Sequence, residues 1–143
     1  MNSFTNKIGT LMNRLTKTLI ATSLSLATSI AIATPPRQLV THNETDFESN
    51  AFVAGTIPSQ HPTKAHDSNT VSWTSVRMAC FGHTTNGKCW ATIKMATNTN
   101  NPVEIGQLSI DLETGVIYPA EISGNGFTLT AIAPGETVIT QTK

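Results

Sequence analysis

From Val71 onward, apolar residues recur at every second position in short runs, a pattern typical of half-buried β-strands. In the clearest run, Cys89, Ala91, Ile93 and Met95 share one apolar face, whereas Thr92 and Lys94 point the other way. No apolar periodicity of the helical type extends beyond one turn after Val71. The pattern therefore predicts strands and no helix longer than a turn.

The next run changes parity. Val103 and Ile105 share one face, whereas the apolar positions from Leu108 to Leu112 lie on the other, with Gly106 between the two sets. A glycine at such a change is typical of a β-bulge. Short strands separated by turns at this spacing predict an antiparallel β-sandwich or barrel. Further strands are expected at 115–118, 127–133 and 137–141, with turns at 113–115, 123–126 and 134–135.

Residues 34–70 differ from the rest of the chain in composition. This stretch is polar, and its apolar residues occur only in short clusters such as Phe52-Val53-Ala54. Four prolines interrupt it, at positions 35, 36, 58 and 62. Because it buries little apolar surface, we expect a flexible polar N-terminal arm with at most one strand, near 50–57. The sandwich domain is then expected to span 71–143.

The first 33 residues carry a third pattern. Three basic residues precede an apolar run from Leu19 to Ala33, which ends on the small-residue triplet Ala31-Ile32-Ala33. This is the layout of a secretory signal peptide. The run is shorter than the roughly 20 apolar residues that a spanning helix needs. We therefore expect cleavage before Thr34 and no membrane anchor afterwards.

Charge and length narrow the classes of function. Three of the nine basic residues lie in the predicted signal, whereas all nine acidic residues follow it, so the mature chain is acidic. An acidic chain lacks the basic footprint of a nucleic-acid-binding protein. The length that remains after cleavage suits one domain with a modest core.

Cys80 and Cys89 are the two cysteines, and both follow the predicted signal into an oxidising compartment. Such a pair predicts a disulfide, with a hairpin turn over 83–86 between the cysteines. The dipeptide Asn86-Gly87 alone predicts a tighter turn, which in a plain hairpin would keep the cysteines apart. These two signals conflict, and the compartment favours the disulfide. The functional alternative is a redox or metal-binding thiol pair together with His83.

A second alternative concerns histidines. His61 and His66, followed by Asp67, could reach one Zn²⁺ or Cu²⁺ ion from a loop. Exposed histidines in a polar segment are the simpler explanation. No nucleophile-elbow motif and no recognisable catalytic pairing occurs, so the sequence predicts no enzyme and no cofactor. A periplasmic metal-binding protein, or a small hydrolase with an unrecognised site, is the alternative to a binding protein.

Charges of opposite sign segregate along the chain. All charges between Val71 and Lys94 are basic, whereas all those between Met95 and Thr142 are acidic. A basic hairpin with His83 at its tip could contact an acidic partner, although solvated faces that differ in sign are the favoured explanation of the pattern. Trp73 is expected in the core, and Trp90 is either core or exposed. The candidate binding surface consists of Arg77, His83, Lys88, Trp90 and Lys94.

The segment from Thr92 to Glu136 resembles the immunoglobulin-type β-sandwich modules of the ASPM/SPD-2/Hydin class. The resemblance rests on the Asn-Thr-rich turn at 96–101, the strand start Gly126-Phe127 and the late turn Pro134-Gly135-Glu136. The family usually has a glycine where Asn100-Asn101 stand here, and it does not require a cysteine pair. The resemblance implies a sandwich fold, a protein-binding or scaffold role, and no enzyme.

These patterns together predict an all-β protein, a small immunoglobulin-like antiparallel β-sandwich after a cleaved signal peptide. We expect a periplasmic or secreted, non-enzymatic binding protein. Its partner is expected to be a protein or an anionic envelope polymer, with no nucleic acid and no membrane anchor after cleavage.

Overall fold

The structure is a computed structural model that describes residues 33–143. The predicted signal peptide, residues 1–33, lies outside the described residues except for Ala33. In the described part, no helix is long and apolar enough to cross a membrane.

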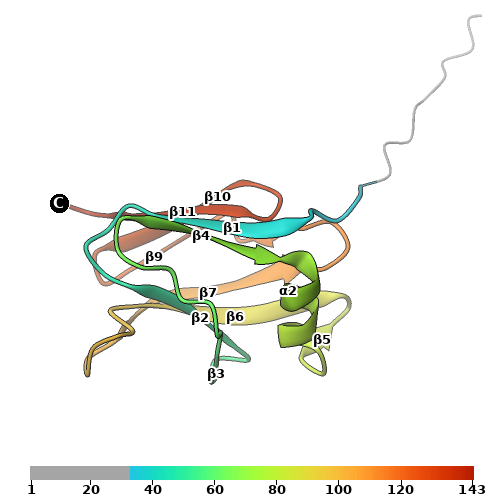
Figure 1. Cartoon of the computed structure of the whole chain (residues 1–143), viewed down its shortest axis with the longest axis horizontal. Helices are drawn as coiled ribbons and strands as arrows, with labels where there is room; N and C mark the ends of the chain where they lie inside the picture. The colour runs from blue at the N-terminus through green and yellow to red at the C-terminus, as the bar shows by residue number, and fades with distance from the viewer. Residues whose placement is uncertain (1–32) are drawn as a thin grey trace, which may run out of the picture. The chain divides into compact units, whose positions relative to one another are not determined.

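Two β-sheets pack face to face around one hydrophobic core, which confirms the predicted small all-β sandwich (Figure 1). The first sheet has the order β4 (Asp67–Ser72), β1 (Gln38–Asn43), β11 (Glu136–Gln141), β10 (Phe127–Ala133) and β9 (Glu121–Gly124). The second has the order β3 (Ile57–Pro58), β2 (Ser49–Val53), β6 (Lys88–Met95), β7 (Val103–Asp111) and β8 (Ile117–Tyr118), and β5 (Thr84–Thr85) pairs with β6. The helix α2 (Trp73–Cys80) connects β4 to β5. The immunoglobulin-like character and the family resemblance stay predictions.

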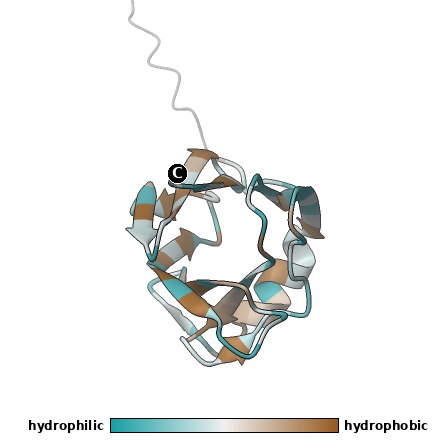
Figure 2. Cartoon of the chain, turned by 90° about the vertical axis from the view of Figure 1, so that its left-hand side faces the viewer, coloured by the Kyte–Doolittle hydropathy of each residue, from teal (hydrophilic) through white to brown (hydrophobic). Residues whose placement is uncertain are grey.

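Period-two patterning positions β6 and β7 as expected, and hydropathy alternates along the strands in Figure 2. Cys89 and Met95 face the core, with 1% and 0% of their surfaces exposed. The β6–β7 register passes from Ile93–Gly106 to Lys94–Glu104, so the predicted bulge near Gly106 is confirmed. The residue left over is Ile105, which is therefore buried in the core together with the apolar residues of the other parity.

Residues 34–70 are not a flexible arm, which corrects that prediction and the domain boundary at 71. They form β1, β2, β3 and the first part of β4, and so contribute to both sheets. β1 lies between β4 and β11 and runs parallel to β11, so this pair also departs from the antiparallel pattern. The sandwich therefore begins near the start of the described chain.

Buried polar residues explain why this region folds although it is poor in apolar side chains. Asn43 is 2% exposed, and its Nδ2 donates to the carbonyl oxygens of Phe47 at 2.7 Å and Lys64 at 3.1 Å. Its Oδ1 accepts from the hydroxyl of Thr45, which is itself buried. Hydrogen bonds of this kind remove the penalty of burying polar groups. A count of apolar residues in the sequence does not detect these buried, hydrogen-bonded polar groups.

The helix α2 was also missed, because it spans only two turns. Ser72 caps its start by accepting a hydrogen bond from the backbone N–H of Ser75 at 3.2 Å. Trp73, Val76 and Cys80 form its buried face, so the expectation for Trp73 is confirmed. The indole Nε1 of Trp73 donates to the carbonyl of Leu112 at 3.0 Å, which fixes the helix to the loop after β7.

The Cys80–Cys89 disulfide is present, but the predicted hairpin turn over 83–86 is wrong. Cys80 is the last residue of α2 and not part of a hairpin strand. The hairpin has the tight Asn86-Gly87 turn, with Thr84 directly opposite Cys89. The bridge therefore links the last residue of α2 to Cys89 on β6, and it does not connect the two strands of the hairpin.

Candidate functional site: the outer face of the second sheet

Two exposed aromatic side chains mark the outer face of the second sheet. Trp90 on β6 and Tyr118 on β8 are 46% and 68% exposed. Both are paired with Ser109 of β7, one from each side, so the three side chains form one row across the sheet. Ser109 is only 2% exposed although it lies on the outer face, which shows that larger neighbours cover it. Two strand spacings, about 10 Å, separate the backbones of the aromatic residues.

Charged residues flank this aromatic row as cross-strand neighbours of opposite sign. Lys88 lies opposite Asp111, and Lys94 lies opposite Glu104. The Nζ of Lys94 also lies 4.5 Å from the ring centroid of Phe52 on β2, within the range of a cation–π contact. The antiparallel pairing of β6 with β7 thus brings together the bases and acids that are segregated along the sequence.

Asp111 has a second set of partners. Its Oδ1 accepts hydrogen bonds from the backbone N–H groups of Glu113 at 2.9 Å and Thr114 at 3.1 Å. These bonds hold the pKa of Asp111 below its ordinary value, and the charge of Lys88 adds to the effect. The carboxylate opposite Lys88 is therefore ionised at neutral pH.

The residues of the predicted binding surface come from three elements. Lys88, Trp90 and Lys94 share the outer face of β6. Arg77 lies on α2, where its Nη2 donates to the Leu112 carbonyl at 3.1 Å and lies 3.4 Å from Glu113. His83 is exposed in the loop between α2 and β5. The structure therefore joins three of the five residues on one face and does not form a surface of a single charge sign.

Other exposed apolar residues had no place in the sequence-based surface. Met78 and Phe81, at the end of α2, are 72% and 86% exposed and border a shallow groove with Arg77. The sequence predicts a strand at 115–118 but does not indicate whether Tyr118 faces the core or the solvent. Its position beside Ser109 depends on the register between β7 and β8, and no sequence signal sets that register.

The histidines of the metal-site alternative do not converge. The Nε2 of His66 lies 2.6 Å from Asp46, whereas His61 lines a cavity between the sheets. Asp67 accepts from the backbone N–H of Ser68. Within residues 33–143, no three His, Cys, Asp or Glu side chains lie close enough together to hold a metal ion. The alternative site of His61, His66 and Asp67 is therefore wrong.

A hydrogen-bonded chain crosses the first sheet. The Nδ1 of His42 on β1 lies 2.7 Å from the Ser68 hydroxyl on β4, and its Nε2 lies 2.8 Å from Oε1 of Glu136 on β11. Ser68 is exposed, and an open depression that also includes Asp67 and Val138 surrounds it. A hydroxyl, an imidazole and a carboxylate in this order are the groups of a nucleophilic triad.

Comparisons with known proteins identify the family. A family model described as the T2SS substrate NttC matches residues 12–142. The crystal structure of the Legionella pneumophila type II secretion system substrate NttC shares 56% sequence identity with this chain. That match covers 74% of this chain and 98% of the other, with a TM-score of 0.73. The chain belongs to the NttC family of type II secretion system substrates. No curated protein matches it.

Membership in the NttC family confirms the export that the first 33 residues predict. Type II secretion substrates pass through the periplasm to the outside, so the protein is secreted. An extracellular location also agrees with the disulfide between Cys80 and Cys89. Neither comparison includes a reaction, ligand or partner in its description.

Proposed function

We propose that this NttC-family member is a secreted, non-enzymatic binding protein that contacts a protein partner through the outer face of its second sheet. The observation that carries the proposal is the exposure of Trp90 and Tyr118 in one row of this face. Exposed aromatic residues are enriched at the centres of protein interfaces, where they bury a large area at a low entropy cost.

The arrangement of charge favours a protein over an anionic envelope polymer. Lys88 and Lys94 each face an acidic residue across the sheet, so the aromatic row has charges of both signs around it. A mixed rim of this kind suits a partner with its own pattern of opposite charges, whereas a polyanion would be repelled by Glu104 and Asp111. Arg77 is already paired with Glu113.

Replacing Trp90 with alanine, alone and with Tyr118→Ala, is expected to weaken partner binding by at least about 30-fold, the loss typical of a hot spot. Partners captured on the immobilised mature protein are identified by mass spectrometry, and their affinities are then measured singly. The melting temperature should hardly change, because both side chains are exposed.

Ile132→Ala is the matched control, because Ile132 is 54% exposed but lies on β10 of the other sheet. An unchanged affinity for Trp90→Ala would place the contact elsewhere. Binding that survives Trp90→Ala but is lost with Lys88→Glu and Lys94→Glu, and that falls steeply with salt, would instead indicate an anionic polymer.

Hydrolysis is a second candidate function, favoured by the chain of Ser68, His42 and Glu136. In an acyl transfer, the Ser68 oxygen attacks an ester carbonyl and His42 Nδ1 takes the hydroxyl proton. The leaving alcohol receives that proton, and water then releases the acid and restores Ser68. The two imidazole nitrogens have the reverse of their usual roles in serine hydrolases, where Nε2 faces the serine. Binding therefore stays the first proposal.

A fluorophosphonate probe separates the two functions. A hydrolase is expected to be labelled at Ser68, and Ser68→Ala or His42→Gln should abolish the labelling and lower ester hydrolysis at least about 100-fold. Ser123→Ala is the control, because the Ser123 hydroxyl is exposed and lies 2.9 Å from the Thr128 hydroxyl. If Ser68 is not labelled under conditions that label a reference hydrolase, the hydrolytic candidate is excluded.

A further inference from the structure

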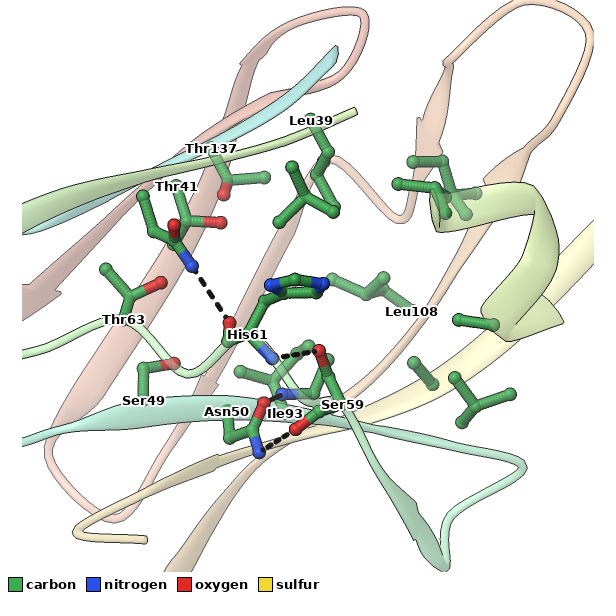
Figure 3. A pocket seen from close by; sticks show the side chains of 18 of the residues that line it. Leu39, Thr41, Ser49, Asn50, Ser59, His61, Thr63, Ile93, Leu108 and Thr137 are labelled. Carbon is green, nitrogen blue, oxygen red and sulfur yellow. Dashed lines mark hydrogen bonds between the residues drawn. The ribbon is translucent and has the colours of Figure 1, made fainter. Parts of the chain in front are cut away.

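A cavity of about 140 Å³ lies between the two sheets, at the side where the edge strands β3 and β4 are located (Figure 3). Its walls are inward-facing side chains of both sheets and of α2. The space is close to that of an engineered protein cavity of roughly 150 Å³ that binds benzene. It therefore has room for one aromatic ring or a short alkyl chain.

Small side chains at two inward positions leave this space open. Ala51 on β2 and Ala91 on β6 occupy positions in the middle of core-forming strands, where larger residues would fill the gap. Leu39, Ala51 and Val71 pack against the core but are only partly buried, because one side of each borders the cavity. Such a partly exposed apolar lining is available to a ligand.

The lining is divided into an apolar and a polar part. The wall formed by β7, β8 and β10 is apolar, with Leu108, Ile117 and Leu129. In Figure 3, Thr41, Ser49 and Thr63 lie on one side of the His61 ring and Leu108 lies on the other. An apolar body with a few polar groups at one end is the usual composition of a small-molecule site.

The segment 59–63 forms the rim and is fixed to both sheets. The Nδ2 of Asn50 on β2 donates to the Ser59 carbonyl at 2.9 Å, and the Nδ2 of Asn69 on β4 donates to the His61 carbonyl at 3.0 Å. Ser49 and Thr63 exchange two backbone hydrogen bonds, at 2.8 and 2.9 Å. A rim held in this way needs little ordering when a ligand binds.

His61 supplies the polar end of the site. His61 is exposed at the rim and its ring is directed toward the cavity, while its backbone N–H donates to the Ser59 hydroxyl at 3.0 Å (Figure 3). Among the bonds of the described residues, none involves the imidazole nitrogens of His61. One nitrogen of a neutral imidazole donates and the other accepts, so the ring can either donate a hydrogen bond to a ligand hydroxyl group or accept one from it.

We infer that this cavity is a binding site for a small amphiphile, which places a single aromatic ring or short alkyl chain between the sheets and a hydroxyl group at His61. The site is separate from the aromatic row of Trp90 and Tyr118, so it does not depend on the proposed protein partner.

The test is a titration of the mature protein with p-cresol, and with toluene as the same ring without the hydroxyl. Methyl-resolved nuclear magnetic resonance is expected to show saturable shifts at Ala51, Ile93 and Leu108. p-Cresol should bind at least about 5-fold more tightly than toluene, because only p-cresol reaches His61 with a hydrogen bond. His61→Ala should remove this difference and leave toluene binding unchanged.

Ala51→Phe fills the cavity and is expected to abolish binding of both probes, whereas Ala133→Phe, on the exposed end of β10, should have no effect. Trp90→Ala should also leave binding unchanged. The inference is overturned if neither probe gives saturable shifts, or if a folded Ala51→Phe variant binds like the wild type. If Ala51→Phe does not fold, nuclear Overhauser contacts between the probe ring and the methyl groups of Ile93 and Leu108 decide in the wild-type protein, and their absence overturns the inference.

Discussion

A chain that begins at Asn69 is expected to be unfolded. The truncation removes β1 from its place between β4 and β11, and it removes β2 from the edge of β6. Both sheets then lose paired strands, and the core loses Leu39 and Val53. A domain of this size is stable by only about 5–15 kcal/mol, and the loss of so many contacts exceeds that margin.

Circular dichroism melting and proton–nitrogen correlation spectra measure this outcome. The truncated chain should give no cooperative transition and a spectrum with little dispersion. The control is a chain that begins at Thr34, which retains all the described strands and should melt cooperatively. A cooperative transition in the chain that begins at Asn69 would show that the sheet of β6 and β7 folds without the N-terminal strands.

The sequence predicted β6, β7, β10 and β11, whose inward positions are mostly apolar. β6 and β7 follow the period-two pattern closely, and Gly106 marked the bulge that changes its parity. β1 was not predicted, and for β2 the sequence allowed at most one strand near 50–57, because polar residues occupy buried positions in both strands, Asn43 at the end of β1 and Ser49 at the start of β2. Patterns of hydrophobicity cannot distinguish a polar residue that is satisfied inside the protein from one that is solvated.

Residues that act together at the candidate site are distant in the sequence. The charge pattern along the sequence predicts a basic surface before Met95 and an acidic one after it, but the β6–β7 pairing places Lys88 beside Asp111 and Lys94 beside Glu104. The row of Trp90, Ser109 and Tyr118 forms only because of the register between β7 and β8. The cavity is lined by side chains from both sheets and from α2. Such sites arise from strand order, which local patterns do not specify.

For the disulfide, the sequence was sufficient to predict the bond itself but not the elements that it joins. The number of cysteines and the expected compartment were enough to predict the bond between Cys80 and Cys89. They were not enough to predict that Cys80 ends a helix, which lets the tight turn at Asn86-Gly87 and the bridge exist together. The bond therefore holds α2 against the second sheet and does not close a simple hairpin.

Replacing both cysteines with alanine is expected to lower the melting temperature by about 10 °C without changing the strand content. On the chain-entropy estimate, a bridge that closes so short a loop contributes about 2–3 kcal/mol to the free energy of unfolding. The loss of stability should be smaller than the loss caused by removing the N-terminal strands, because Trp73 and Val76 still pack against the core and the Trp73 indole still bonds to Leu112.

Thermal melting of the variant beside the oxidised wild type measures the change, and wild type melted with a reductant is the control that should match the variant. Equal melting temperatures for all three samples, or free thiols at both cysteines in the native secreted protein, would contradict a stabilising bridge.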